Sequence, residues 1–480
     1  MNEHLPPLPK TLDRTATWLQ LVRLFLRSGL AIFLRGSYGF IGVSRHKVPH
    51  IPRSGQPNLF MVREPRLVRE MLVERATDFP KSQLMRSMLL LLTGDSIFVS
   101  NGKIWQRQRR IIDQAFENAR VRDVFELMNN ACADVLVRFS NKIGGQTNGI
   151  VVLDMDIEMT HFAGDIIFRT IFSEPMTALD AQQIFSAFDI FQRISFAHGY
   201  LALIGLPTRM FPSYWRAKRA AKAIRAVLRS LLDRRLSALS RGQETSQSDI
   251  LATLIKASDP VTQTRFDEDE LLDQIAMLFL AGHETSAASL GWALYLIANR
   301  PDVQERMRSE ASAAFGDRIP QFSDLRKMPF IRDVFRETLR LYPPVAFFAR
   351  DAAKAENFGG QTIASGEPMI VPTWLMHRHS AYWEDPNQFN PDRFSNDATR
   401  EAQRNAYLPF SMGPRVCVGA AFALQEAVLI LSQLIRRFEF MPVDGHTPDP
   451  VSRLTVRSDN GIPMKVKLRT PDHADVTDGL

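Results

Sequence analysis

The most chemically distinctive stretch of the sequence surrounds one cysteine, Cys417. It reads Phe410-Ser-Met-Gly413-Pro-Arg415-Val-Cys417-Val-Gly419 and leads into a helical pattern that begins near Ala420. Glycines let the backbone turn tightly and point amide N–H groups at the sulfur. The positive end of the following helix, together with the nearby Arg415, favours a thiolate. These features predict a thiolate sulfur that serves as a soft ligand to iron.

The other cysteine, Cys132, has a different setting, because it lies within the helical pattern of residues 129–136. Two cysteines form at most one disulfide, which is too few for a secreted framework, so we expect a reducing, cytoplasmic location. A free cysteine in a helix usually behaves as a small buried hydrophobe. We expect Cys132 to be one.

A polar group interrupts the most apolar helical pattern of the chain, which runs from about 271 to 300. Four acidic residues precede this pattern and Pro301 follows it, as expected at the two ends of a helix. A helix of this length is a rod of about 45 Å and must cross the molecule. Its middle contains Gly282, His283, Glu284 and Thr285. Glycine inside a helix costs about 1 kcal/mol relative to alanine, so the insert predicts a functional site.

Three further motifs place charged side chains on shared helix faces or near turns. Glu337 and Arg340 are three residues apart on one predicted helix, and Arg393 follows in the segment of residues 389–394. Trp105 and Arg109 are four apart, so an indole N–H and a guanidinium can both donate to one carboxylate. Taken alone, the Glu337–Arg340 pair could be a surface salt bridge worth under about 1 kcal/mol.

In this order and spacing, the motifs resemble those of the cytochrome P-450 superfamily of heme-thiolate monooxygenases. Every fixed position of the heme-binding signature Phe-x-x-Gly-x-Arg-x-Cys-x-Gly is matched by the cysteine loop, and the resemblance extends from Trp105 to Gly419. It implies a soluble member of bacterial type with the family's triangular prism fold, mainly α-helical with small β-sheets. It also implies heme b as cofactor, with Cys417 as the ligand of its iron.

The resemblance assigns roles to the remaining motif residues. Glu337, Arg340 and Arg393 form a buried network behind the heme loop. Trp105, Arg109, Arg350 and Arg415 bind the heme propionates, although Arg350 could instead be a charge at a strand edge and Trp105 a core aromatic. Glu284 and Thr285 are the acid–alcohol pair that delivers protons during oxygen activation, and Gly282 leaves room for O₂. The alternative for Thr285 is a hydroxyl that bonds only to the preceding turn; His283 is assigned no chemistry.

The pattern along the chain predicts one large domain, residues 61–480, preceded by a basic amphipathic segment, residues 1–60. That segment carries eight basic and two acidic residues, whereas the rest of the chain carries 51 basic and 50 acidic residues. The near-neutral body argues against nucleic acid as a partner. Residues 18–34 could pack on the body or touch a membrane surface, but they are too interrupted to span one. Near the C-terminus, residues 453–457 and 464–468 flank Asp459-Asn-Gly and predict a β-hairpin.

The expected reaction follows from the resemblance. O₂ and two electrons from NAD(P)H, delivered by a separate ferredoxin or flavodoxin with its reductase, insert one oxygen atom into a small, mostly apolar substrate. No flavin-like or ferredoxin-like segment follows the last hairpin. An acidic donor could dock on the basic residues around the cysteine side of the molecule, namely Lys103, Arg107, Arg109, Arg110 and Arg120. Two alternatives are an enzyme that uses peroxide and a non-catalytic heme sensor, and the intact Glu284–Thr285 pair disfavours both.

The substrate pocket is less readable from the sequence. Candidate lining segments are residues 85–97, 185–196, 201–211 and 345–348. Phe185, Phe188 and Phe191 recur every three residues, a spacing that is more often typical of core packing.

Overall fold

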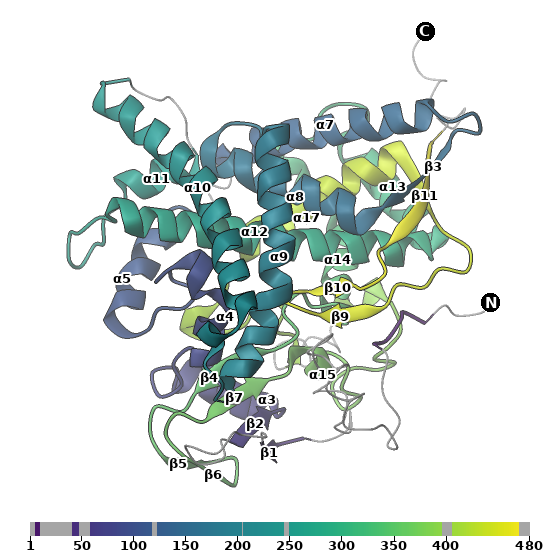
Figure 1. Cartoon of the computed structure of the whole chain (residues 1–480). Helices are drawn as coiled ribbons and strands as arrows, with labels where there is room; N and C mark the ends of the chain where they lie inside the picture. The colour runs from purple at the N-terminus through teal and green to yellow at the C-terminus, as the bar shows by residue number, and fades with distance from the viewer. Residues whose placement is uncertain are drawn as a thin grey trace.

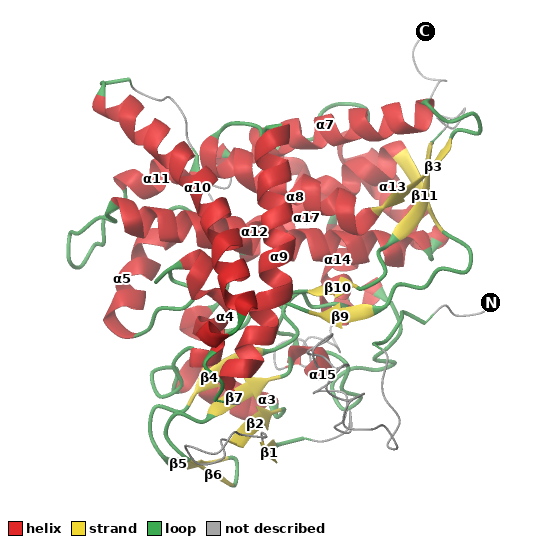
Figure 2. Ribbon diagram, in the orientation of Figure 1, coloured by secondary structure: helices red, strands yellow, loops and turns green. Residues whose placement is uncertain are grey.

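The computed structural model describes residues 5–9, 41–47, 58–117, 122–203, 205–243, 249–395 and 406–469. Helices make up the body of the molecule, and small sheets lie at its lower and right-hand edges in Figure 1 and Figure 2. This confirms the predicted mainly helical architecture. The predicted amphipathic segment, residues 18–34, lies outside the described residues.

The central helix is α12, Glu268–Ala298, close to the predicted range. Its N-terminus is a capping box, in which the Asp267 carboxylate accepts from the Glu270 amide and the Glu270 side chain accepts from the Asp267 amide. Pro301 opens the next helix, α13, Pro301–Phe315, because a proline at the first helical position loses no helical hydrogen bond. The predicted boundaries were therefore correct to within a turn.

The central helix α12 is buried along most of its length and joins two hydrophobic cores. Residues 271–280 pack in one core with α4, α9, α10 and α11, whereas residues 290–298 pack in another with α7, α13, α14 and α17. The polar insert of residues 282–286 therefore lies where the two cores meet. The other helices are α3 (Pro65–Arg69), α4 (Gln83–Thr93), α5 (Gly102–Asp113), α7 (Phe125–Gly144), α8 (Met155–Phe172), α9 (Ala178–Leu203), α10 (Pro212–Ser240), α11 (Ile250–Lys256), α14 (Pro329–Leu341), α15 (Thr373–Met376) and α17 (Ala420–Arg437).

A four-stranded sheet at the lower edge has the order β1-β2-β7-β4. Its strands are β1 (Val43–Lys47), β2 (Asn58–Val62), β7 (Pro368–Val371) and β4 (Phe348–Asp351). β2 and β7 are parallel, with Phe60 opposite Met369, and the two other pairings are antiparallel. The short antiparallel pair β5 (Glu356–Phe358) and β6 (Gln361–Ile363) lies beside it. This sheet matters for the site because β4 carries Arg350.

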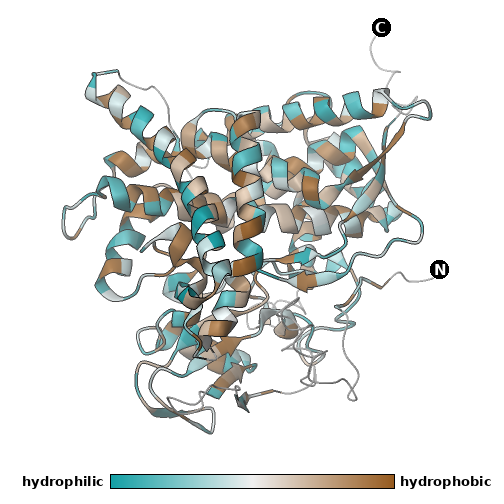
Figure 3. Ribbon diagram, viewed as in Figure 1, coloured by the Kyte–Doolittle hydropathy of each residue, from teal (hydrophilic) through white to brown (hydrophobic). Residues whose placement is uncertain are grey.

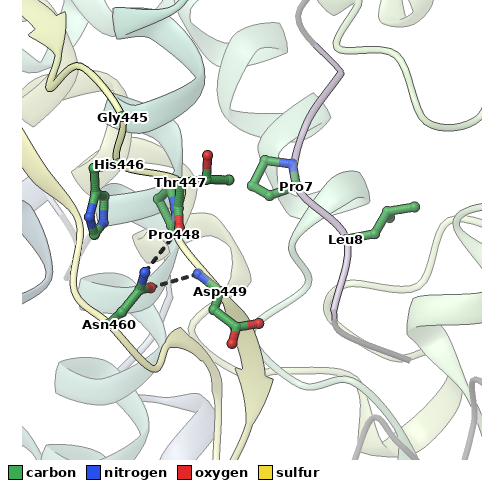
Figure 4. A pocket seen from close by; sticks show the side chains of 8 residues that line it. All are labelled: Pro7, Leu8, Gly445, His446, Thr447, Pro448, Asp449 and Asn460. Carbon is green, nitrogen blue, oxygen red and sulfur yellow. Dashed lines mark hydrogen bonds between the residues drawn. The ribbon is translucent and has the colours of Figure 1, made fainter. Parts of the chain in front are cut away.

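The predicted C-terminal β-hairpin is wrong. The strands β10 (Val456–Ser458) and β11 (Pro463–Leu468) exist, but β10 pairs with β9 (Pro450–Ser452) and β11 lies between β3 (Ile150–Asp154) and β8 (Phe438–Pro442). At the intervening turn, the Asn460 side chain donates to the Thr447 carbonyl and accepts from the Asp449 amide, across from Pro7 (Figure 4). Long-range pairing therefore separates two strands that adjacent turn residues seemed to join.

Within the part of the chain that the structure describes, no helix combines the length and the apolarity needed to cross a bilayer.

Candidate active site around Cys417 and the central helix

The loop before α17 holds Cys417 by its own backbone. A single 3₁₀ turn, Gly413–Arg415, precedes the cysteine, and the Cys417 amide donates to the Phe410 carbonyl over 3.0 Å. Gly413 has φ +74°, and a Cβ there would lie 2.1 Å from the Leu72 carbonyl oxygen. Only glycine therefore fits that position. Gly419 has φ −89° and a Cβ there would meet nothing closer than 3.9 Å, so its backbone does not require glycine.

The Cys417 side chain is accessible to solvent, yet protein surrounds it closely. Burial raises the pKa of the thiol, and the Gly419 amide together with the charges of Arg109 and Lys81 opposes that rise. The charges that favour the thiolate are therefore those of Arg109 and Lys81 rather than that of the predicted Arg415, and they do not outweigh burial by themselves. A bound metal cation would supply the further stabilisation that the thiolate needs, because metal binding displaces the thiol proton. Cys132, by contrast, is 2% exposed in α7, which confirms the prediction of a buried hydrophobe.

Several cations converge on the same loop. The Arg415 guanidinium lies 4.2 Å from the centre of the Trp105 ring and donates to the Ser100 carbonyl and to Asn101 Oδ1 over 3.1 and 2.7 Å. Arg350 in β4 is 4% exposed, and its Nη1 donates to the Ala349 carbonyl over 2.9 Å. The structure thus brings these motif residues together from α5, β4 and the cysteine loop.

Two further residues complete this cluster. Arg109 donates to the Val416 carbonyl over 2.6 Å and pairs with Asp113 over 2.8 Å. Lys81, which belongs to no motif and was missed by the sequence analysis, forms a β-bridge with Arg350. Its side chain lies 4.6 Å from the centre of the Phe98 ring.

The positive charge of this cluster is not balanced by the protein. Among the described residues, no carboxylate lies within salt-bridge distance of Lys81, Arg350 or Arg415. Burial lowers the pKa of Arg350 to about 10; burial, with repulsion from Arg350 and Arg109, lowers the pKa of Arg415 to about 9. Burial also lowers the pKa of Lys81, and Arg350 and Arg415 lower it further. The cluster therefore fits a bound group that brings its own carboxylates, as the heme propionates would.

In the middle of α12, Glu284 is 2% exposed and bonds to a strand far along the chain. Arg457 of β10 donates to its carboxylate from Nε and Nη2 over 2.9 and 2.7 Å, and the Thr455 hydroxyl donates to Oε1 over 2.7 Å. Burial acts to raise the pKa of Glu284, but Arg457 and these hydrogen bonds outweigh it and leave that pKa below its usual value. Arg457 and Thr455 were missed because both lie outside every motif.

Thr285 lies next to Glu284 but bonds in another direction. Its hydroxyl donates to the Ala281 carbonyl over 2.6 Å, the arrangement given above as the alternative to proton delivery. The hydroxyl oxygen can still accept hydrogen bonds in this rotamer. A Cβ at Gly282 would lie 2.8 Å from Ile167 of α8, so glycine here also allows α8 and α12 to pack closely.

His283 is fully buried in an aromatic cage. Its ring lies 5.2 Å from Phe185, 5.1 Å from Phe188 and 5.5 Å from Phe279, measured between ring centres. Both ring nitrogens lack a hydrogen-bond partner within the described ranges, and burial lowers the pKa to about 4, so the ring is neutral near pH 7. The phenylalanine stripe of α9 thus packs as core, with Phe191 fully buried. The other suggested pocket segments remain predictions.

Behind the cysteine loop, Glu337 and Arg340 are both fully buried on α14. Arg340 Nε and Nη2 donate to the two Glu337 oxygens over 2.7 and 2.8 Å, and Arg393 Nε donates to Oε1 over 3.2 Å. Arg340 Nη1 donates to the His377 carbonyl over 2.8 Å, and His377 Nε2 accepts from the Leu408 amide over 2.8 Å. The network therefore reaches the chain two residues before Phe410.

The basic residues suggested for donor docking are largely neutralised. Arg107 pairs with Glu270, Arg109 with Asp113 and Arg110 with Asp259, at 2.7, 2.8 and 2.5 Å. Arg120 lies outside the described residues. The surface is therefore less positive than its basic residues alone indicated.

Comparisons with known proteins agree with this geometry. The family model described as Cytochrome P450 matches residues 52–465. Cyclooctatin synthase from Streptomyces melanosporofaciens is 27% identical over 410 residues, which cover 84% of this chain and 85% of the relative. Cyclooctat-9-en-7-ol 5-monooxygenase from the same organism is 29% identical over 399 residues, covering 82% and 83%. The crystal structure of the cytochrome P450DA heme domain has a TM-score of 0.77 at 23% identity and covers 97% of this chain and 98% of that one.

Proposed function

Because this chain belongs to the cytochrome P450 family, we propose that it inserts one atom of O₂ into a small, mostly apolar organic substrate. The protein is a monooxygenase, an oxidoreductase whose cofactor is heme b. The observation that carries the proposal is the unbalanced positive charge of Lys81, Arg350 and Arg415 beside Cys417.

The residues that would hold the cofactor divide into two groups. Cys417 would ligate the iron through Sγ. In the loop that positions it, Gly413 provides the positive φ, the Phe410 carbonyl accepts from the Cys417 amide, and the Gly419 backbone amide donates to the sulfur. The propionate side is formed by Trp105, Arg109, Arg350, Arg415 and, as an addition from the structure, Lys81. When bound, a heme with a thiolate ligand activates O₂, because the sulfur donates electron density to the iron.

Proton delivery is the task of Glu284 and Thr285. In the structure each is engaged elsewhere: Arg457 and Thr455 bind Glu284, and Ala281 accepts from Thr285. To donate toward O₂, the Thr285 hydroxyl must release the Ala281 carbonyl. Glu284 must turn away from Arg457 and take up a proton from solvent before it can replace the proton that Thr285 gives. Arg457 is therefore a positioning residue that keeps Glu284 ionised until it turns.

Glu337, Arg340 and Arg393 act on the loop rather than on the reaction. Their hydrogen bonds fix the backbone at His377 and, through the His377 ring, at Leu408. A loop anchored at this point presents Cys417 in one position, which a metal ligand requires.

Electrons come from NAD(P)H through a separate ferredoxin or flavodoxin and its reductase, in a cytoplasmic setting. The low cysteine count supports that compartment. Gly282 leaves room for O₂, and the basic N-terminal segment contacts a membrane surface peripherally. The apolar substrate is supported by the name of one relative, which gives cyclooctat-9-en-7-ol as the compound that enzyme oxidises.

The proposal is tested by exchange of each cysteine. Cys417→His should abolish the red-shifted Soret band of the reduced carbon monoxide complex, whereas Cys132→Ser should leave it intact. A compound library is then screened for a low-spin to high-spin shift, and each hit is turned over under ¹⁸O₂. Incorporation of one ¹⁸O atom into product supports the assignment. Loss of the red-shifted Soret band in the Cys132 variant alone would overturn the assignment of Cys417 as the iron ligand. Product without ¹⁸O would overturn the proposed insertion of an oxygen atom from O₂.

A further inference from the structure

Arg457 is shared by two carboxylates on different helices. Its Nε and Nη2 donate to Glu284 of α12, whereas its Nη1 donates to Asp156 over 2.9 Å and to the Thr160 hydroxyl over 2.8 Å. Asp156 and Thr160 lie in the first two turns of α8, whose later turns are largely hydrophobic (Figure 3). Across the described residues, no second cation lies within salt-bridge distance of either carboxylate. One cation therefore serves two anions.

The two carboxylates differ in their access to solvent and in their titration. The Glu284 side chain is 2% exposed and the Asp156 side chain 20%. Burial acts to raise both pKa values, but Arg457 outweighs it only at Glu284, so the pKa of Glu284 is lowered and that of Asp156 is raised. Two further titratable groups act on the pair: His283, which is neutral near pH 7, and Asp154, whose charge also raises the pKa of Asp156. In this arrangement Arg457 therefore favours Glu284.

Glu284 can leave Arg457 only if the guanidinium keeps an anionic partner. Arg457 is 4% exposed, and an unpaired buried charge strongly destabilises a fold. Asp156 has the capacity to be that partner, because its Oδ1 already accepts from Nη1, whereas its Oδ2 accepts no hydrogen bond from the residues that the structure describes. A guanidinium and a carboxylate pair best through two parallel hydrogen bonds. A rotation that keeps Nη1 on Asp156 and Thr160 would carry Nη2 from Glu284 to Asp156 Oδ2.

We propose that Asp156 is a second seat for Arg457, which receives the guanidinium when Glu284 takes up a proton and turns towards O₂. The proton comes from water, so one cation and two anions become one cation, one anion and one neutral acid, and Arg457 stays paired. The first turn of α8 favours Asp156 as that anion, because the N-terminal end of a helix is positive. Asp156 acts only through Arg457 and is therefore a positioning residue. This inference rests on the proposed function and explains how a buried acid held by a cation becomes free to deliver protons.

The first test is a crystal structure of the heme-bound variant Glu284→Gln, in which the amide stands in for the neutral acid. We expect Arg457 Nη1 and Nη2 both to lie within about 3 Å of the Asp156 oxygens. In a wild-type crystal, Nη2 should instead lie on Glu284. If Nη2 stays with the side chain at position 284 in the variant, the inference is overturned. This test needs no turnover, so its result does not depend on the proposed function.

The second test compares urea unfolding midpoints at pH 7. Asp156→Asn removes one of two carboxylates from Arg457 in the wild type, but the only one in the Glu284→Gln background. The fall in the midpoint should therefore be about twofold larger or more in that background, because a buried cation is then left unpaired. Glu158→Gln is the matched control on α8, since Glu158 pairs with Arg138 and Lys142 instead, and its effect should be the same in both backgrounds. Equal effects of Asp156→Asn in the two backgrounds would count against the second seat.

The third test measures kcat and KM at pH 7 with a spin-shifting compound from the screen described above. Asp156→Asn should lower the product yield and kcat by about tenfold or more, the least that a positioned proton donor usually contributes, and leave KM unchanged. Asp156→Glu, which keeps the carboxylate, should recover much of the loss, and Glu158→Gln should behave like the wild type. An equal loss in Glu158→Gln, or wild-type kcat in Asp156→Asn, would refute the inference. If the wild type itself forms no labelled product, the proposed function fails, and the crystal structure still decides whether Arg457 changes partner.

Discussion

Arg457 holds Glu284 by two hydrogen bonds, from Nε to Oε1 over 2.9 Å and from Nη2 to Oε2 over 2.7 Å. The two side chains are 4% and 2% exposed. Arg457 also donates to Asp156 and Thr160 of α8 over 2.9 and 2.8 Å. One strand residue near the C-terminus therefore connects the acid of the central helix with a neighbouring helix.

Removal of Arg457 should destabilise the fold through Glu284. Arg457→Met leaves a buried carboxylate without its cation, which costs about 3–5 kcal/mol. Adding Glu284→Gln should recover part of that loss, because the amide carries no charge. Urea unfolding at pH 7 measures the stability of the single and double variants. Lys465→Met, which breaks a surface pair with Asp444, is the control. Strictly additive effects of Arg457→Met and Glu284→Gln would contradict the pairing.

Disruption of the Glu337 network should lower heme content as well as stability. Glu337→Ala leaves Arg340 buried and unpaired, at a cost of about 3–5 kcal/mol. The variant should purify with little heme, which the ratio of Soret to protein absorbance measures. Arg193→Ala breaks an exposed pair on α9 and should change stability by under about 1 kcal/mol. Full heme occupancy in Glu337→Ala would show that the network does not support the loop.

Glu426 should make stability fall as pH rises. It accepts from the Ser286 hydroxyl over 2.6 Å, and burial raises its pKa to about 7. The unfolded chain releases this proton near pH 4.5, so stability falls between about pH 4.5 and 7 and then levels off. The variant Glu426→Gln cannot ionise at this position. Relative to the wild type, its free energy of unfolding should therefore be higher at pH 8 than at pH 4.5 by up to about 3 kcal/mol. Exposed Glu439→Gln is the control; an equal effect of Glu426→Gln at both pH values would refute the shift.

The two glycines that flank Cys417 should differ in tolerance. Gly413→Ala forces a side chain into a positive φ, at about 1–2 kcal/mol, and against the Leu72 carbonyl. We expect poor folding and little heme. Gly419→Ala adds a methyl in ordinary van der Waals contact and should retain heme. Comparable heme content in the two variants would count against the loop geometry.

Thr285→Ala should separate oxygen consumption from product formation. Without the hydroxyl, the protein should still consume NAD(P)H and O₂ in the presence of a substrate. Product yield should fall by about 10² or more, the usual contribution of a positioned proton donor, and hydrogen peroxide should appear instead. Thr285→Ser should recover much of the yield. If Thr285→Ala formed as much product per NAD(P)H consumed as the wild type, the only role of this hydroxyl would be its hydrogen bond to the Ala281 carbonyl.

Several features could be predicted from the sequence because local interactions determine them. The bounds of α12 follow from the capping box of Asp267 and Glu270 and from Pro301, all close to the helix ends. The pairing of Glu337 with Arg340 follows from a spacing of three residues on a helix. The buried state of Cys132 follows from its place in a helical apolar pattern.

Other features depend on which distant segments pack together, and spacing along the chain does not contain that information. Glu284 and Arg457 are 173 residues apart, and the bond exists only because β10 pairs with β9 beside α12. Lys81 meets Arg350 through a β-bridge between segments that no motif connects. A buried charge takes whichever partner the fold brings within hydrogen-bond distance, since leaving it unpaired costs several kcal/mol. The sequence by itself thus determined the cysteine loop and the central helix, whereas the tertiary structure decided the partners of their charged side chains.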